Sequence, residues 1–467
     1  MLCYGDLDAL VGRVAAGLVA AGVQPGNRVV TWLPKSIEGV AALFGAARAG
    51  AVFVPANPQL KSAQVAHIVA DSGAVLLITS RARAVGLAVA ARVLTLEDDW
   101  AALISGEPVT VPVGDDDLAA LLYTSGSTGA PKGVMLSQRN LWLAADSVRT
   151  FLGTQADDRI LSVLPHGFDY GLNQLTSAWA AGAQAVLLDY LTPNDVVRAV
   201  ERHAITQLGA VPPLWQSLAA ADWRGGGASL RALTNSGGHL HARTSAALRE
   251  LFPAARLFLM YGLTEAFRAT FLDPALAATH PDSVGTAIPH AEVLIVRRDG
   301  SVAADDEPGE LVQSGPLVAQ GYWRDPERTA QRFRPAPAAS RAGGMAVWSG
   351  DTLRRGADGL LTFVGRDDEM IKTSGHRVSP TEIEDAALAS GTVTAVAAFG
   401  TPDAALGQAV VLIASAAIPD AEAPLRAELA SVLPGFMQPA RIVWLDALPV
   451  NANGKLDRAQ LRATYAA

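Results

Sequence analysis

Small hydroxyl residues, glycines and one lysine are concentrated in segment 121–133, which reads LLYTSGSTGAPKG. The apolar residues 118–123 predict a buried strand, and the glycines after it let successive backbone N–H groups turn inward around an anion. The hydroxyls add hydrogen-bond donors and the lysine adds a cation, so the segment predicts a polyphosphate site. The candidate residues are Thr124, Ser125, Gly126, Ser127, Thr128, Gly129 and Lys132.

Two other interpretations of this segment fit less well. In a Walker-type P-loop the lysine directly follows a glycine and precedes a Ser or Thr that binds Mg²⁺. Here Lys132 follows Pro131 and precedes Gly133. A flexible Gly/Ser linker is the other alternative, but linkers seldom begin directly behind a strand and end in Pro-Lys-Gly.

A carboxylate follows a second apolar strand, in the motif YGLTE at 261–265. Ligands of open α/β sheets bind at the carboxyl ends of the strands. Glu265 is therefore a candidate Mg²⁺ ligand, Thr264 a candidate phosphate contact and Tyr261 a candidate stacking partner for a base. The motif alone does not decide this, because Thr and Glu at the start of a helix more often serve as its cap.

Three shorter motifs each allow a structural and a functional interpretation. Asp351, in WSGD at 348–351, is either in an ordinary Asx-turn or a carboxylate for ribose hydroxyls. GRDD at 365–368 is either a charged linker or a hinge beside a ribose-contacting arginine. Lys455 follows Asn-Gly, a tight-turn signal that puts it at a loop tip, where a solvated surface lysine is the simpler alternative.

The composition excludes several classes of protein. The 467 residues carry a formal net charge of −8, which argues against nucleic-acid or membrane-surface partners. No run of about 18 apolar residues is present, so no membrane span is expected. Cys3 is the single cysteine, which excludes an internal disulfide and favours a reducing compartment. Asp6 and Asp8 lie inside the first apolar segment, unlike in a signal peptide, so we expect a soluble, cytoplasmic protein.

The elements that must position these motifs change character along the chain. Up to about residue 260, short apolar strands such as 52–55 alternate with amphipathic helices, which predicts an α/β architecture with largely parallel sheets. From about residue 284, short apolar strings between Asp/Gly turns predict antiparallel strands, in a small barrel or a distorted sheet. About a hundred residues with strand and helix signals follow, enough for a small α+β domain. We expect a body at 1–365 and a C-terminal domain at 366–467.

The order and spacing of these five motifs resemble the superfamily of adenylate-forming enzymes, which includes acyl-CoA synthetases, non-ribosomal-peptide adenylation domains and beetle luciferase. The resemblance covers nearly the whole chain. It implies a large N-terminal body of two α/β sheet layers with a small antiparallel β subdomain, and a mobile small α+β C-terminal domain. Family members usually have some tens of residues before the helix expected here near Tyr4, so a true start further upstream is compatible with the resemblance.

The resemblance also implies a role for each motif. The loop 124–129 with Lys132 would cover the β- and γ-phosphates of ATP, Thr264 would contact the α-phosphate, and Glu265 would carry Mg²⁺. The remaining implied residues are Asp351 and Arg366 for the ribose, Tyr261, Gly237 and Gly238 for the adenine, Lys455 as the catalytic lysine of the small domain, and Asp368 as the hinge.

The chemistry implied by the resemblance explains these residue types. A carboxylate attacks the α-phosphorus of ATP, pyrophosphate leaves, and cations offset the negative charge that spreads over the oxygens. A thiol then attacks the acyl-adenylate where Lys455 stood, so the small domain must rotate about Asp368. The thiol belongs either to coenzyme A or to the phosphopantetheine arm of a separate carrier protein. Segment 371–377 looks more like the acyl-CoA synthetases and would help to form the pantetheine tunnel.

The acid pocket is expected around PHGFDYG at 165–171. In amino-acid-activating members a Phe-Asp pair there binds the substrate ammonium, and Asp169 matches that aspartate. A buried Asp169 with Arg268 nearby favours a small polar or amino acid, unless the two only pair with each other. The alternative is an acyl-CoA synthetase for a non-amino carboxylic acid. The expected pocket residues are His166, Phe168, Asp169, Tyr170, Asn173 and Arg268.

Three further classes are distinguished by their products or residues. A luciferase-like enzyme would depend on oxygen and emit light. An inactive nucleotide-binding homologue would be expected to lack Lys455, Glu265 or Asp351, and all three are present. A P-loop ATPase would release orthophosphate, whereas an adenylate-forming enzyme releases pyrophosphate and AMP.

Overall fold

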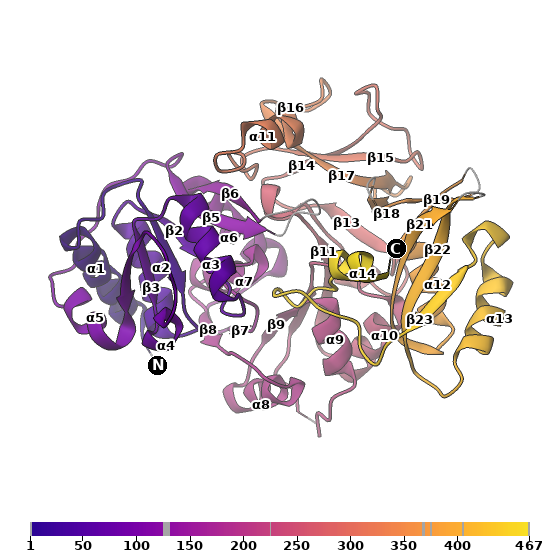
Figure 1. The fold of residues 1–467 in the computed structure, drawn as a ribbon, viewed down its shortest axis with the longest axis horizontal. Coiled ribbons are helices and arrows are strands. Elements are labelled where there is room, and N and C mark those ends of the chain that lie inside the picture. Colours follow the sequence, from indigo (N-terminus) through magenta and orange to yellow (C-terminus); the bar gives the residue numbers. More distant parts are fainter. Residues whose placement is uncertain are drawn as a thin grey trace.

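In the part of the chain that the structure describes, the strands form three sheets, two in the N-terminal part and one in the C-terminal part (Figure 1). The computed structural model describes residues 2–124, 131–224, 226–366, 369–373, 376–403 and 406–465.

The first sheet has the strand order β4-β3-β1-β2-β5-β6, and only β6 is antiparallel to its neighbour. Alternate residues of its strands point to opposite faces, so Val29 packs with α1 and α2 while Val30 packs with α3. Both faces are therefore covered, which explains the continuous apolar runs in the sequence. The bounds are α1 Tyr4–Ala20, β1 Arg28–Trp32, α2 Ile37–Arg48, β2 Val52–Pro55, α3 Ser62–Ser72, β3 Leu76–Thr79, α4 Arg81–Ala84, β4 Arg92–Thr95, α5 Leu96–Leu103, β5 Leu118–Thr124 and β6 Lys132–Ser137.

The second sheet begins with parallel strands and continues into antiparallel ones, in the order β8-β7-β9-β10-β11-β12-β13-β18-β17-β15-β14, with β16 paired to β17. The predicted antiparallel strands are confirmed, and they extend this sheet instead of closing into a barrel. The bounds are α6 Gln138–Leu152, β7 Arg159–Ser162, α7 Asp169–Ala180, β8 Gln184–Leu187, α8 Pro193–His203, β9 Gln207–Ala210, α9 Pro212–Ala219, β10 Ala232–Asn235, α10 Ala242–Leu251, β11 Arg256–Tyr261, η1 Thr264–Ala266, β12 Thr270–Phe271, η2 Pro274–Leu276, β13 Ser283–Ala287, β14 Glu292–Val296, β15 Gly309–Ser314, α11 Pro326–Arg332, β16 Phe333–Pro335, β17 Met345–Arg355 and β18 Leu361–Arg366.

The third sheet has the order β20-β19-β22-β21, with β23 beside β22, and packs against α12 and α13. Its core is separate from those of the first two sheets. The loop before α14 reaches back toward the middle of the molecule (Figure 1). The bounds are β19 Ile371–Thr373, β20 His376–Val378, α12 Pro380–Ala389, β21 Val393–Asp403, β22 Gly407–Ala416, α13 Glu422–Val432, η3 Gly435–Met437, β23 Arg441–Trp444 and α14 Arg458–Tyr465.

The α/β fold class predicted from the sequence is confirmed, with two sheets in the body and a smaller C-terminal α+β part. The predicted domain boundary between residues 365 and 366 stays a prediction. It falls at the end of β18, which belongs to the second sheet, and the next strand, β19, belongs to the third sheet. Within the described ranges, no helix has the length and apolar character needed to cross a membrane.

Candidate active site

The predicted phosphate loop connects two antiparallel strands. β5 ends at Thr124 and β6 begins at Lys132, and the two residues face each other across the hairpin. The residues Ser125–Gly129 between them lie outside the described part of the chain. A Walker-type P-loop leads from a strand into a helix, whereas a strand follows here, so that alternative is wrong.

Lys132 is held in a short chain of polar contacts with Tyr322 and Glu265. Its Nζ donates a hydrogen bond of 2.7 Å to Tyr322 Oη, which in turn donates one of 2.6 Å to Glu265 Oε1. Nζ also lies 3.4 Å from the same carboxylate oxygen and 3.9 Å from the centre of the Tyr322 ring. Sequence reasoning missed Tyr322, because its only signal was an aromatic residue in a loop 190 positions away from Lys132.

Glu265 remains a carboxylate although it is almost fully buried. Burial alone would raise its pKa, but the cations Arg332 and Lys132 lower it below the usual value. The pKa of Lys132 is lowered mainly by burial, and Glu265 opposes that shift. A buried, ionised carboxylate is a suitable hard ligand for Mg²⁺, so the structure fits the predicted metal role of Glu265.

Thr264 does not act as a helix cap. The segment Thr264–Ala266 is a single 3₁₀ turn, and Leu263 occupies the position before it. The Thr264 hydroxyl donates instead to Asp169 Oδ1, at 2.9 Å, from the start of α7. The capping interpretation of this motif is therefore wrong for the Thr264 side chain, which joins the YGLTE motif to the predicted acid pocket.

Asp351 lies inside strand β17, where its carboxylate accepts a hydrogen bond of 2.5 Å from Tyr261 Oη at the end of β11. The Asx-turn interpretation is wrong, since Asp351 lies within a strand and its side chain bonds to a residue of a non-adjacent strand of the same sheet. Arg366 faces Asp351 across β17 and β18, although its side chain is outside the described part. The two predicted ribose contacts thus come from paired positions. Asp368, the predicted hinge, lies outside the described residues.

Lys455 is at the tip of a tight turn, as its Asn-Gly signal predicted: the Asn451 N–H donates to the Lys455 carbonyl at 2.7 Å. The lysine is half-buried, and its Nζ lies 4.3 Å from the centre of the Phe168 ring. A solvated surface lysine is therefore excluded in this arrangement. The positive charge of Lys455 also favours the ionised form of Asp169, the residue that follows Phe168.

Gly237, expected near the adenine, packs against the stem of Lys455. A Cβ on Gly237 would lie 2.7 Å from Lys455 Cε and 3.3 Å from Nζ. The residue also has φ +82°, which favours glycine. Gly238 lies beside Pro212, and a Cβ there would approach its Cγ to 3.2 Å. The absence of a side chain at Gly237 thus makes room for the lysine.

Asp169 and Arg268 are both buried but make no direct salt bridge with each other in the described structure, so the idea that they only pair with each other is not supported. The Arg268 guanidinium carbon lies 4.6 Å from the centre of the Tyr170 ring, and its Nε and Nη2 have no hydrogen-bond partner. Burial raises the pKa of Asp169, and the charges of Arg268 and Lys455 oppose that rise. Asp169 and Arg268 therefore interact through their electrostatic fields without forming a direct ion pair.

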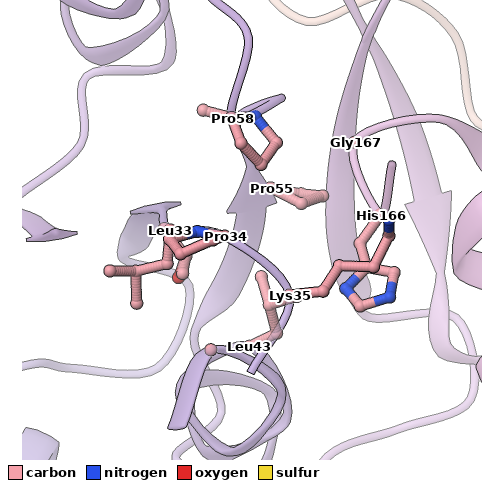
Figure 2. A pocket seen from close by; sticks show the side chains of 11 residues that line it. Leu33, Pro34, Lys35, Leu43, Pro55, Pro58, His166 and Gly167 are labelled. Atoms are coloured by element: carbon pink, nitrogen blue, oxygen red, sulfur yellow. The ribbon is translucent and has the colours of Figure 1, made fainter. Parts of the chain in front are cut away.

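His166 lines a small cavity together with residues of segment 31–58, and Figure 2 shows the Lys35 side chain reaching toward His166. Lys35 Nζ donates to the carbonyls of Val163 and Leu188. Burial, followed by the charge of Lys35, lowers the pKa of His166 to about 3, so this imidazole is neutral at pH 7. Its Nε2 lies 3.1 Å from Ser162 Oγ.

The other predicted pocket residues divide into two groups. Phe168 contacts Lys455, and Tyr170 donates a hydrogen bond of 2.7 Å to the carbonyl of Thr234 at the end of β10. Asn173 turns away from this group, because its amide donates to Ala144 of α6 at 3.5 Å.

Asn57, which sequence reasoning also missed, ties the C-terminal loop to the body. Its Nδ2 donates to the carbonyl of Ala452 at 2.7 Å and to Asn453 Oδ1 at 3.0 Å. Asn57 is 6% exposed and follows β2. No local pattern could have singled it out, since its partners are almost 400 residues away in the sequence.

Comparison with known proteins agrees with this geometry. A feruloyl-CoA synthase from an Amycolatopsis species is 34% identical, over 99% of this chain and 94% of its own length. The phosphinothricin tripeptide synthetase PhsC of Streptomyces viridochromogenes is 33% identical over 98% of this chain but only 42% of its own length.

Solved structures share the same fold. The ATP-bound MatB of Rhodopseudomonas palustris superposes with a TM-score of 0.90, at 28% identity, over 99% of this chain and 93% of its own. The o-succinylbenzoate coenzyme A synthetase MenE of Bacillus subtilis, in complex with ATP and magnesium, gives 0.85 at 26% identity, over 98% and 94%.

Family models match both parts of the chain. Residues 1–323 match the model of the AMP-binding enzymes, and residues 382–455 match the model of the AMP-binding enzyme C-terminal domain. With the motifs, the fold and these matches in agreement, the chain belongs to the AMP-binding enzyme family.

Proposed function

We propose that the protein joins a carboxylic acid to a thiol at the expense of ATP, through an acyl-adenylate and with release of pyrophosphate. The observation that carries this proposal is the position of Lys455, which comes from the C-terminal part yet lies against Phe168 and Gly237 of the body. Lys455 lies away from its own sheet, near the buried and hydrogen-bonded pair of Asp169 and Thr264. It is therefore suited to stabilise negative charge on a reacting anion.

In the first half-reaction the substrate carboxylate attacks the α-phosphorus of ATP. Thr264 donates to Asp169 and the charge of Lys455 acts on the same carboxylate, so both would reach oxygens at one reacting centre. Lys132, which is held by its hydrogen bond to Tyr322, would bind the leaving pyrophosphate. These donors are fixed before reaction in a largely buried site, where charge stabilisation is stronger than in water. Glu265 would hold Mg²⁺, which supplies further positive charge to the phosphates.

In the second half-reaction a thiol must reach the carbonyl that Lys455 covers. We infer that residues 366–467 turn as a unit and carry Lys455 away, with Asp368 as the hinge. Two observations support this. The C-terminal sheet has a core of its own, and the loop 451–455 is held to the body through Asn57, a contact that can break without unfolding either part.

The substrate that this site favours is a small polar acid, with an amino acid as the preferred case. Asp169 would accept the ammonium group, since its second carboxylate oxygen is not used by Thr264. The partnerless Nε and Nη2 of Arg268 would serve a second polar group. A long apolar chain would leave these two buried charges uncompensated, which is costly. A non-amino carboxylic acid remains the alternative, and the likeness to feruloyl-CoA synthase favours it.

The acceptor is the phosphopantetheine thiol of either coenzyme A or a separate carrier protein. Relatives named for each kind of pathway, a CoA synthase and a tripeptide synthetase, are similar to this chain over nearly its whole length. A cytoplasmic location is part of the proposal, supported by the one exposed, unpaired cysteine, Cys3.

The test is a product assay across substrate classes. The protein is incubated with ATP, Mg²⁺ and single acids drawn from amino acids, small dicarboxylic and aromatic acids, and fatty acids, with and without coenzyme A or a carrier protein. Pyrophosphate and AMP should appear with a polar acid, and ATP–pyrophosphate exchange should need no thiol. Release of orthophosphate, or no AMP with any acid, would overturn the proposal. Exchange only with unfunctionalised fatty acids would remove the role of Asp169 and keep the reaction class.

A further inference from the structure

Two histidines of the body and one aspartate of the C-terminal part meet outside the active site. His239 and His241 lie between β10 and α10, and Asp385 is on α12. Asp385 Oδ1 lies 2.6 Å from His241 Nδ1 and 3.4 Å from His239 Nε2. One ligand atom from each residue falls within 4.8 Å of the others. Among the described residues this is the only such group of three.

The local backbone explains why both histidines face the same way. In an extended segment, side chains two positions apart point to the same side. Leu240, between them, is 3% exposed and belongs to the core of the second sheet, so its neighbours are turned outward toward α12. The two imidazole rings stand edge to face with their centres 5.1 Å apart.

The distances suit a small tetrahedral cation. With metal–ligand bonds of about 2.0–2.1 Å, ligand atoms in a tetrahedral site are separated by roughly 3.3 Å. The His239–Asp385 distance of 3.4 Å already matches this edge. The His241–Asp385 distance of 2.6 Å is that of a hydrogen bond, and it would open by a fraction of an ångström around an ion.

Acidic side chains lie near the cluster, although one of them, Glu384, is paired with Arg458 at 2.6 Å. Asp282 and Glu384 act on His239 in addition to Asp385. His239 Nε2 is buried and makes no hydrogen bond with good geometry. A buried imidazole nitrogen that makes no hydrogen bond and lies beside a carboxylate is suited to bind a divalent cation.

We propose that His239, His241 and Asp385 form a binding site for Zn²⁺ or a similar divalent transition metal, bridging the body and the C-terminal part. Two imidazoles and a carboxylate are a ligand set that zinc uses, with water as the fourth ligand. Given the rotation proposed above, on which this inference rests, the ligands would meet only while Lys455 is in the active site, because Asp385 and Lys455 belong to the same C-terminal part. A bound ion therefore favours this arrangement over any in which that part has turned away.

The experiment measures Zn²⁺ binding to the full-length protein and its three single variants, His239→Gln, His241→Gln and Asp385→Asn. Zinc is titrated against a chromophoric chelator after removal of trace metal. Loss of even an outer-shell partner typically weakens metal binding by about 10–100-fold, so each variant should bind at least roughly tenfold more weakly than the wild type. His280→Gln is the matched control, because His280 faces Asp358 at 3.5 Å in a pair without a third ligand.

Amide hydrogen exchange supplies a second readout that does not depend on enzymatic activity. Zinc should slow exchange both in the segment 235–245 and in α12 of the wild type and of His280→Gln, and in neither segment of Asp385→Asn. Equal zinc affinity in wild type and all three variants would overturn the proposal, as would protection confined to one side. Thermal unfolding without zinc shows whether each variant is folded.

Discussion

Lys455 shows how a residue's setting changes its chemistry. In the sequence it is a lysine at a turn. In the fold its side chain contacts Phe168 and Gly237 and interacts electrostatically with Asp169. Under the proposed mechanism this position would limit it to the first step, because a thiol must later occupy the same space. The residue would then separate the two half-reactions.

We expect Lys455→Ala to slow adenylate formation by about 10² to 10³, the usual effect of losing one preorganised charge-stabilising donor. Thioester formation from supplied acyl-adenylate should be unchanged. Single-turnover assays of each half-reaction measure both. Lys61→Ala, which removes an exposed lysine before α3, serves as the control. An equal loss in both half-reactions would contradict the assignment.

At the scale of the element, the loop after β10 serves two purposes. Its glycine, Gly237, gives space to the lysine, and His239 and His241, two and four residues later, face α12. The loop lies at the carboxyl end of a parallel strand, where open α/β sheets place their ligand contacts. The position of this loop thus affects both the active site and the contact with the C-terminal part.

Gly237→Ala should displace Lys455 and lower the rate of adenylate formation by about 10², since misplacing a catalytic group by about 1 Å can cost that much. Gly359→Ala is the matched control, because Gly359 has the same φ of +82° with open space around it. Both variants carry the same backbone strain, so a difference between them reports the contact with Lys455. If both variants lose activity equally, strain and not contact is the cause.

At the scale of the molecule, the first two sheets share part of one core, whereas the third sheet has a core of its own and meets the body through specific contacts near the active site. Asn57 makes two of them, to Ala452 and Asn453. Each intramolecular hydrogen bond contributes about 0.5–1.5 kcal/mol. These two hydrogen bonds are therefore strong enough to favour the arrangement in which the C-terminal loop contacts the body. They are also weak enough to let the C-terminal part move away from it.

Asn57→Ala should reduce adenylate formation by roughly tenfold, because the loss of two hydrogen bonds costs about 1–3 kcal/mol of docking free energy. The thioester half-reaction, which needs the C-terminal part turned away, should not slow. Asn194→Ala, at an exposed position of α8, tests for a general effect on stability. A slower thioester step in Asn57→Ala would argue against a docking role.

The sequence by itself determined the fold class, the antiparallel character after residue 284 and the turn at Lys455, because each depends on neighbours within a few positions. Apolar alternation, glycine and Asn-Gly carry that information locally. The motif order was also enough to identify the family, since its chemistry requires those residue types.

Only the tertiary structure decided which distant side chains meet. Tyr322 between Lys132 and Glu265, Asn57 against the C-terminal loop, and the histidine pair opposite Asp385 have no local signal. The capping and Asx-turn interpretations were wrong for the same reason. The side chain of Thr264 bonds to a helix, and that of Asp351 to a strand, that are remote in the sequence. The physical reason is that a side chain's partner depends on how whole elements pack, and packing is set by many residues far apart along the chain.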